Sequence, residues 1–147
     1  MSTKVLFCAA AISISLLSGC ASVPMASKEQ DAALKSFQAP PENNAGLYIY
    51  RNTFAGQGLK KTVSLDGSVI GETANKTYFY KMLTPGQHTL STESEFSDNA
   101  ITFHADAGKN YYVQQFIKMG VFVGGANLEV VPESEGKKEI MQCELAK

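Results

Sequence analysis

The chain has 147 residues, of which 44% are hydrophobic, and its 13 basic and 14 acidic side chains give a formal net charge of −1. This length fits one domain that buries a substantial core. The only basic doublets are Lys60-Lys61 and Lys137-Lys138. Such a scattered, near-neutral charge excludes the basic footprint of a nucleic-acid-binding protein, and it provides no cluster for phosphate or anionic lipid.

The first twenty residues have the layout of a secretory signal. Lys4 provides a short basic start, and residues 5–17 form an apolar run that is too short for a comfortable membrane span. The run closes on the sequence LSGC, which ends at Cys20. These four residues resemble the lipobox of bacterial lipoproteins, whose cysteine receives a diacylglycerol before the signal is cleaved and the new amino terminus is acylated.

This resemblance implies a membrane anchor at Cys20 and a signal peptide over residues 1–19. Several acyl chains at one cysteine attach a protein stably, since each buried methylene contributes about 0.8 kcal/mol. The residue after the cysteine is Ala21 and not an aspartate, which in enterobacteria-like sorting implies export to the outer membrane. We therefore expect a lipid-anchored protein on the periplasmic face of the bacterial outer membrane.

The three cysteines have different predicted fates. Cys8 is removed with the signal and Cys20 is lipidated, so Cys143 is left alone and the mature chain forms no internal disulfide. Cys143 is predicted to be a small buried hydrophobe in the last segment. The alternative is a free thiol that pairs with another chain in an oxidising periplasm.

Residues 20–44 are predicted to be a lipidated tether that contains a short helix and spaces the domain from the bilayer. Ser27 is a candidate N-cap, Gln30 stands where a capping box requires it, and the apolar residues that follow share one face. We expect the helix over 28–37. The prolines and asparagines of 38–44 end it, so the globular domain is expected over 45–147.

From residue 45 to residue 131 the hydrophobic pattern has a period of two, with turn signals at intervals of roughly ten residues. The predicted strands are 47–51, 62–66, 69–71, 76–83, 87–93, 101–104, 110–118 and 128–131. Residues 119–126 are either a buried strand with bulges or an exposed apolar loop. A short C-terminal helix is expected within 137–146.

Two motifs of this region resemble the PEGA class of envelope β modules. They are VSLDGSVIG at 63–71, with a tight Asp66-Gly67 turn, and PGQHTL at 85–90. Together with the LSGC sequence and the YIYR strand at 48–51, they resemble a family of small bacterial lipoproteins described only as a domain of unknown function. The resemblance spans about 37–131 and implies an all-β immunoglobulin- or transthyretin-like sandwich of about seven to eight strands. It implies no activity.

The histidines do not indicate a reactive site. His88 shares a strand face with Leu90, so it is predicted to pack inside or at the rim and to donate to a backbone carbonyl, whereas His104 lies on a polar face. Because these faces differ in character, no shared metal site is expected. The sequence contains no nucleophile elbow and no base near Cys143. No catalytic residue, cofactor or metal ion is predicted.

The aromatic residues are the main surplus, with six tyrosines, eight phenylalanines and no tryptophan. Tyr111 and Tyr112 must face opposite sides of one strand, which places one at the core rim and the other on the outer face. Packing explains the tyrosines, and the alternative is a tyrosine-lined surface for glycan or protein contact. Val121, Phe122 and Val123 extend that candidate partner surface if they are exposed.

These patterns predict a lipid-tethered structural or protein-interaction module of the cell envelope. Its work is expected to be binding, through a sheet face or an open sheet edge, and the chain is not expected to be an enzyme. The alternative is a periplasmic module that binds glycan or peptide through its tyrosines. The expected partners are the membrane, through Cys20, and an envelope protein, with no nucleic acid.

Overall fold

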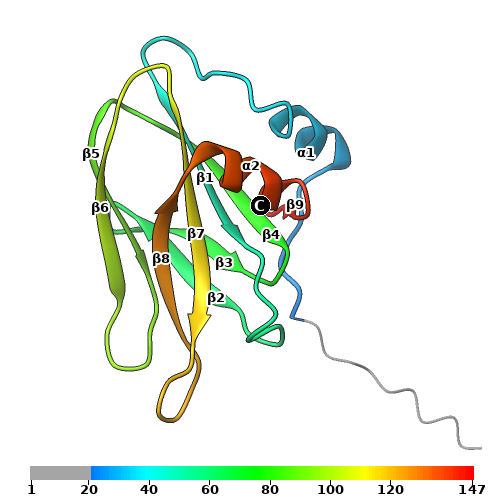
Figure 1. The fold of residues 1–147 in the computed structure, drawn as a ribbon, viewed down its shortest axis with the longest axis vertical. Helices are drawn as coiled ribbons and strands as arrows, with labels where there is room; N and C mark the ends of the chain where they lie inside the picture. The colour runs from blue at the N-terminus through cyan, green and yellow to red at the C-terminus, as the bar shows by residue number, and fades with distance from the viewer. Residues whose placement is uncertain (1–20) are drawn as a thin grey trace, which may run out of the picture.

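The computed structural model describes residues 21–147, so the predicted signal, the LSGC sequence and Cys20 lie outside the described residues. Within this range the chain forms two packed β-sheets and two short helices (Figure 1). One sheet has the order β8-β7-β1-β4-β9, formed by β8 (Gly125–Val131), β7 (Asn110–Lys118), β1 (Ala45–Arg51), β4 (Thr77–Leu83) and β9 (Glu144–Leu145). The other has the order β3-β2-β5-β6, formed by β3 (Ser68–Thr73), β2 (Lys61–Leu65), β5 (Gly86–Thr92) and β6 (Asn99–Ala105).

The predicted all-β sandwich is confirmed, and each of the eight predicted strands corresponds to one of β1 to β8. The sequence pattern does not predict β9, because its two residues are too few to show a period. The Asp66-Gly67 turn between β2 and β3 has φ of 49° and 79°. Positive φ at both residues is what a type I′ hairpin turn requires, so the hairpin prediction is confirmed.

The core between the two sheets follows directly from the period of two. Alternate residues of each strand point inward, and their large apolar side chains are Leu47, Ile49, Val63, Phe79, Leu83, Leu90, Val113 and Leu128. All of them are buried. A sheet face that buries aliphatic side chains in this way is the main source of stability in a sandwich.

The position of β1 decides which loops lie together. It pairs antiparallel with β4 and parallel with β7. Parallel strands end at the same edge, so the loop after β1 and the loop after β7 leave the sandwich at one end (Figure 1). The antiparallel neighbour β8 therefore begins at that same end.

Helix α1 (Lys28–Leu34) begins where the sequence predicts and ends earlier. The Ser27 side chain accepts from the Gln30 backbone N–H and the Gln30 side chain accepts from the Ser27 N–H, both at 3.2 Å, so the predicted capping box is confirmed. The helix does not reach Phe37, whose φ is 51°. This left-handed residue turns the Phe37 ring onto the outer face of the sheet, 5.5 Å from the Tyr48 ring.

Helix α2 (Glu133–Ile140) exists but begins earlier than the predicted range of 137–146. Pro132 is its N-cap, and acidic side chains occupy the first turn while lysines occupy the last. This charge order suits the helix dipole. The helix packs on β7 and β1 over the outer face of the five-stranded sheet.

The segment before α1 differs from the spacer expected from the sequence. Val23 and Met25 pack against the core between the sheets. The Pro24 carbonyl accepts from the N–H of Lys147, and Met25 bridges Ala146. Residues 23–37 are therefore part of the folded domain, which begins close to the predicted lipidation site. Neither helix within 21–147 has the length and hydropathy to cross a membrane.

Candidate functional site

Three loops at one end of the sandwich expose large apolar side chains. They are the β1–β2 loop (52–60), the β5–β6 loop (93–98) and the β7–β8 loop (119–124) (Figure 1). The exposed side chains are Phe54, Phe96, Met119, Val121, Phe122 and Val123, which are between 57% and 90% accessible to solvent. We call these six side chains the apolar loop end. Clustered apolar surface of this kind marks contact with another molecule more often than isolated exposed residues do.

The β7–β8 loop resolves the alternative left open by the sequence, because residues 119–123 form an exposed loop and not a buried strand. The Glu95 carboxylate in the β5–β6 loop accepts the backbone N–H groups of Val121, at 2.6 Å, of Phe122, and of Val123, at 3.3 Å. Partial desolvation opposes ionisation, yet these three donors together hold the pKa of Glu95 below its ordinary value. One carboxylate thus fixes the backbone of the exposed apolar tip.

Replacing Glu95 with alanine is expected to release this tip. The amide hydrogens of residues 121–123 should then exchange with solvent about tenfold faster, because they lose a charged acceptor. Since the pKa of Glu95 is lowered, the hydrogen bonds are complete above the ordinary value of 4.5 and are lost as the pH falls through the folded-state pKa. Hydrogen exchange by mass spectrometry measures both effects. Asp98→Ala, in the same loop, is the matched control, and equal exchange in the two variants would refute this role of Glu95.

The Arg51 side chain, at the end of β1, holds the β1–β2 loop against the sandwich. Its guanidinium is fully buried, and it donates to the carbonyls of Gly56, at 2.5 Å, and Thr73, at 3.3 Å. Burial lowers the pKa of Arg51 from its ordinary value. Gly56 itself has φ of 70° and lies against Ile117 of β7, where an added Cβ would approach to 2.7 Å. The loop that carries Phe54 is therefore fastened to the sandwich.

Tyr111 and Tyr112 do face opposite sides of β7, but neither forms the exposed surface considered from the sequence. Tyr111 packs at the rim of the core between the sheets, and its hydroxyl accepts the Asp106 N–H at 2.8 Å. Tyr112 is 2% exposed beneath α2, so the prediction that it lies on a partner surface is wrong. The cause is that α2 folds back directly after β8 and covers the outer face of β7.

The other tyrosines belong to a second core on this outer face, covered by the two helices. Its buried members are Tyr48, Tyr50, Tyr78, Tyr112, Val131, Ile140, Cys143 and Leu145. The Tyr48 hydroxyl donates to the Leu34 carbonyl at 2.9 Å, and the Tyr78 hydroxyl donates to the Asp31 carbonyl at 3.4 Å. Burial raises the pKa of Tyr48 to about 12. Tyr48 and Tyr78 therefore hold α1 on the sheet, and the buried tyrosines of the second core are not available for a ligand.

His88 behaves as the sequence predicts and has a partner that the sequence analysis missed. It is 9% exposed, and its Nε2 lies 2.8 Å from the Thr84 carbonyl. Its Nδ1 lies 2.6 Å from Oδ2 of Asp66, the first residue of the tight turn. The Asp66 hydrogen bond, followed by the Thr84 contact, raises the pKa of His88. Because both ring nitrogens of His88 form hydrogen bonds, the His88–Asp66 pair joins β5 to the turn between β2 and β3 and offers no free base.

The second histidine of the described chain, His104, belongs to no cluster of metal-ligating side chains. His104 is exposed, with Nε2 3.6 Å from Oδ1 of Asp106. Within residues 21–147, no group of three or more His, Cys, Asp or Glu side chains is arranged to hold a metal ion.

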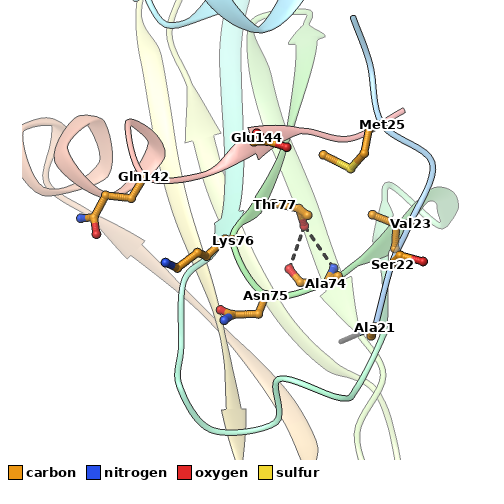
Figure 2. Close-up of a pocket in the computed structure, with 10 residues that line it drawn as sticks. All are labelled: Ala21, Ser22, Val23, Met25, Ala74, Asn75, Lys76, Thr77, Gln142 and Glu144. Atoms are coloured by element: carbon orange, nitrogen blue, oxygen red, sulfur yellow. Dashed lines mark hydrogen bonds between the residues drawn. The ribbon is translucent and has the colours of Figure 1, made fainter. Parts of the chain in front are cut away.

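A cavity of 390 Å³ lies where the described chain begins, between segment 21–25, the β3–β4 turn and the last residues (Figure 2). Its lining comprises Ala21, Ser22, Val23, Met25, Ala74, Asn75, Lys76, Thr77, Gln142 and Glu144. The Thr77 hydroxyl is already engaged with the backbone of Ala74, donating to its carbonyl at 2.8 Å. None of the described residues that line this cavity is a histidine or a cysteine. A smaller cavity of 250 Å³ lies beside Phe37 and Asn110.

Cys143 is buried in the second core, as the sequence predicts, and is 1% exposed. Its Sγ lies 3.4 Å from the Glu139 carbonyl, and burial raises the pKa of the thiol to about 12. The thiolate that reacts with disulfides is therefore almost absent at neutral pH. This position opposes the alternative that Cys143 pairs with another chain.

In the folded domain, Cys143 is expected to be unreactive toward a thiol reagent such as dithionitrobenzoate. Burial and the raised pKa protect it, so modification should require unfolding. The measurement is the rate of thiol release in buffer and in denaturant. Rapid modification in buffer, at the rate of a free peptide cysteine, would show that the second core is open.

Comparison with known proteins gives a family and a similar bacterial protein. The model of a family described as "Protein of unknown function (DUF2846)" matches residues 41–126. An "Uncharacterized protein" of Haemophilus influenzae is 51% identical over 131 residues, which cover 89% of this chain and 78% of the relative. No solved structure matches.

Proposed function

Since the chain belongs to the family of unknown function DUF2846, we propose a role from its own residues: it is an outer-membrane lipoprotein, tethered through acyl chains at Cys20. The observation that carries this proposal is the LSGC sequence at the end of an apolar run that follows a basic start. The PEGA-like motifs at 63–71 and 85–90 support a place in the cell envelope. Ala21, in the position after the lipidated cysteine, supports the outer membrane.

The tethered domain acts as a structural or interaction module, by contact and not by chemistry. Within 21–147, His88 has both ring nitrogens engaged, and the one cysteine thiol is buried. Val121, Phe122 and Val123 are the residues proposed for contact with another molecule, because they are exposed and held in place. The glycan- or peptide-binding alternative depended on exposed tyrosines, and the second core buries four of them.

The anchor is tested by comparing the wild-type chain with Cys20→Ala in membrane fractionation, together with metabolic labelling by an alkyne-tagged fatty acid. The wild type is expected in the membrane fraction with the label attached. Cys20→Ala should be unlabelled and released from the membrane. Cys143→Ala is the matched control, since it removes the other mature cysteine and should leave both readouts unchanged. A Cys20→Ala variant that is still held in the membrane would contradict the anchor.

A further inference from the structure

The exposed apolar side chains are distributed unevenly between the two ends of the sandwich. Of the ten large hydrophobic side chains exposed within 21–147, six lie in its three loops. Residues 52–59 and 119–124 carry no charged side chain. The opposite end instead carries turns with Asp66, Thr84 and Asp106. Only one end of the sandwich therefore suits a less polar environment.

The chain enters the folded domain at this same end. Ala21 lines the cavity beside Asn75 of the β3–β4 turn. The Asn75 side chain accepts the backbone N–H of Thr53 at 3.0 Å, and Thr53 precedes Phe54 in the β1–β2 loop. In Figure 1 the start of the described chain and the three loops lie on the same lower side of the sandwich. The proposed lipidation site, Cys20, is thus bonded to Ala21, and Ala21 lies at the same end of the sandwich as the apolar loop end.

The link between the lipid and the domain is short. Val23 already packs against the core, so only Ala21 and Ser22 separate it from Cys20. An extended chain spans at most about 3.6 Å per residue, so at most roughly 11 Å can separate Val23 from the proposed lipidation site. A domain held this closely must present one of its surfaces to the bilayer.

Resting on the proposed anchor at Cys20, we propose that the bilayer is what covers the apolar loop end. Phe54, Met119 and the 121–123 tip enter the interfacial region of the membrane beside the acyl chains. The long axis of the sandwich then points away from the bilayer, with the apolar loop end facing it. Aromatic and aliphatic side chains favour this region without any basic cluster. The N–H groups of the tip are already accepted by Glu95, so inserting the tip leaves them satisfied.

The acidic β5–β6 loop limits the depth of this contact. It carries Glu93, Glu95 and Asp98 around Phe96. The Asp98 carboxylate is exposed and remains in water, whereas Glu95 stays with the tip whose N–H groups it accepts. The β7–β8 and β1–β2 loops therefore insert further than the β5–β6 loop, which stays at the level of the headgroups. A protein partner at the same surface is the competing outcome that the experiment separates.

The test uses tryptophan as a depth reporter, because the chain contains none. The lipidated Phe122→Trp protein is reconstituted into vesicles of phosphatidylethanolamine and phosphatidylglycerol, a fraction of which carries brominated acyl chains. Val69→Trp is the matched control, since Val69 is 68% exposed at the end of the sandwich that carries the Asp66-Gly67 turn. Both sites are exposed, so neither substitution should change the thermal unfolding of the domain.

The proposal expects the indole emission of the Phe122→Trp protein to be blue-shifted and quenched by brominated lipid, and that of the Val69→Trp protein to be unshifted and unquenched. If the Phe122→Trp protein floats with the vesicles but its emission is unquenched, the membrane contact is overturned while the anchor stands. If its emission shifts only after envelope proteins are added, the occupant is a protein and the proposal is also overturned. If the protein does not float with the vesicles, the anchor fails and the contact fails with it.

Discussion

Gly136→Ala in α2 is expected to destabilise the protein by about 1–3 kcal/mol, although glycine to alanine in a helix ordinarily stabilises by up to about 1 kcal/mol. A Cβ at Gly136 would lie 2.4 Å from Cβ and 2.6 Å from Cγ of Tyr112. Real Cβ atoms do not approach this closely, and Tyr112 is buried beneath the helix. The helix must therefore move off β7, and Gly136→Leu should be worse still.

Urea denaturation followed by circular dichroism measures this effect, with Ser134→Ala as the matched control. Ser134 is an exposed residue of the same helix, so its replacement should change the free energy of unfolding by less than about 0.5 kcal/mol. If Gly136→Ala were as stable as the wild type, α2 could not lie against Tyr112 as described.

Tyr48→Ala is expected to lower the free energy of unfolding by roughly 3–5 kcal/mol, the range found when large buried aromatic residues are truncated. The Tyr48 ring is the centre of the second core. Its centroid lies 4.8 Å from that of Tyr80, 5.3 Å from that of Tyr112 and 5.5 Å from that of Phe37. Removing it leaves a cavity that these rings cannot all fill, and it also removes a hydrogen bond to α1. Thermal and urea unfolding measure the loss.

Two conservative variants separate the ring from its hydroxyl. Tyr48→Phe removes the donor to the Leu34 carbonyl and should cost about 1 kcal/mol. The Tyr50 hydroxyl is buried without a partner in the described residues, so Tyr50→Phe should be neutral or stabilising. Equal losses for the two variants would contradict the assignment of α1 to the outer face through Tyr48.

Local signals in the sequence explain why most of the fold could be predicted. The period of two along β5 and β6, the Asp66-Gly67 turn and the Ser27 capping box each act within a few residues, and the structure contains all of them. The start of α2 is different. Pro132 and the acidic residues after it are equally consistent with a turn and with the first turn of a helix, and packing on Tyr112 decides between them.

The candidate site could be predicted only in part, because its main contacts join residues far apart in the chain. Val121, Phe122 and Val123 were identifiable from their apolar sequence between glycines. The Glu95 carboxylate, which accepts hydrogen bonds from their backbone, lies far earlier in the chain. Asp66, the hydrogen-bond partner of His88, likewise lies far earlier in the chain than His88. Phe54 and Phe96 did carry a signal, since each is an aromatic residue in an otherwise polar or glycine-containing loop.

The burial of Tyr112 shows the limit of reasoning from one strand. Alternation correctly assigns Tyr111 and Tyr112 to opposite faces of β7. It does not show whether the outer face is open, which depends on where α1 and α2 return to the sheet. A tyrosine-rich outer face therefore predicts a covering layer as well as it predicts a binding surface.

The first measurement to make is the intact mass of the protein purified from membranes, because both the proposed envelope role and the proposed membrane contact depend on Cys20. We expect a chain that begins at Cys20 and carries a diacylglycerol on its sulfur and an acyl group on its amino terminus. A chain that still contains residues 1–19 and has an unmodified Cys20 would contradict it.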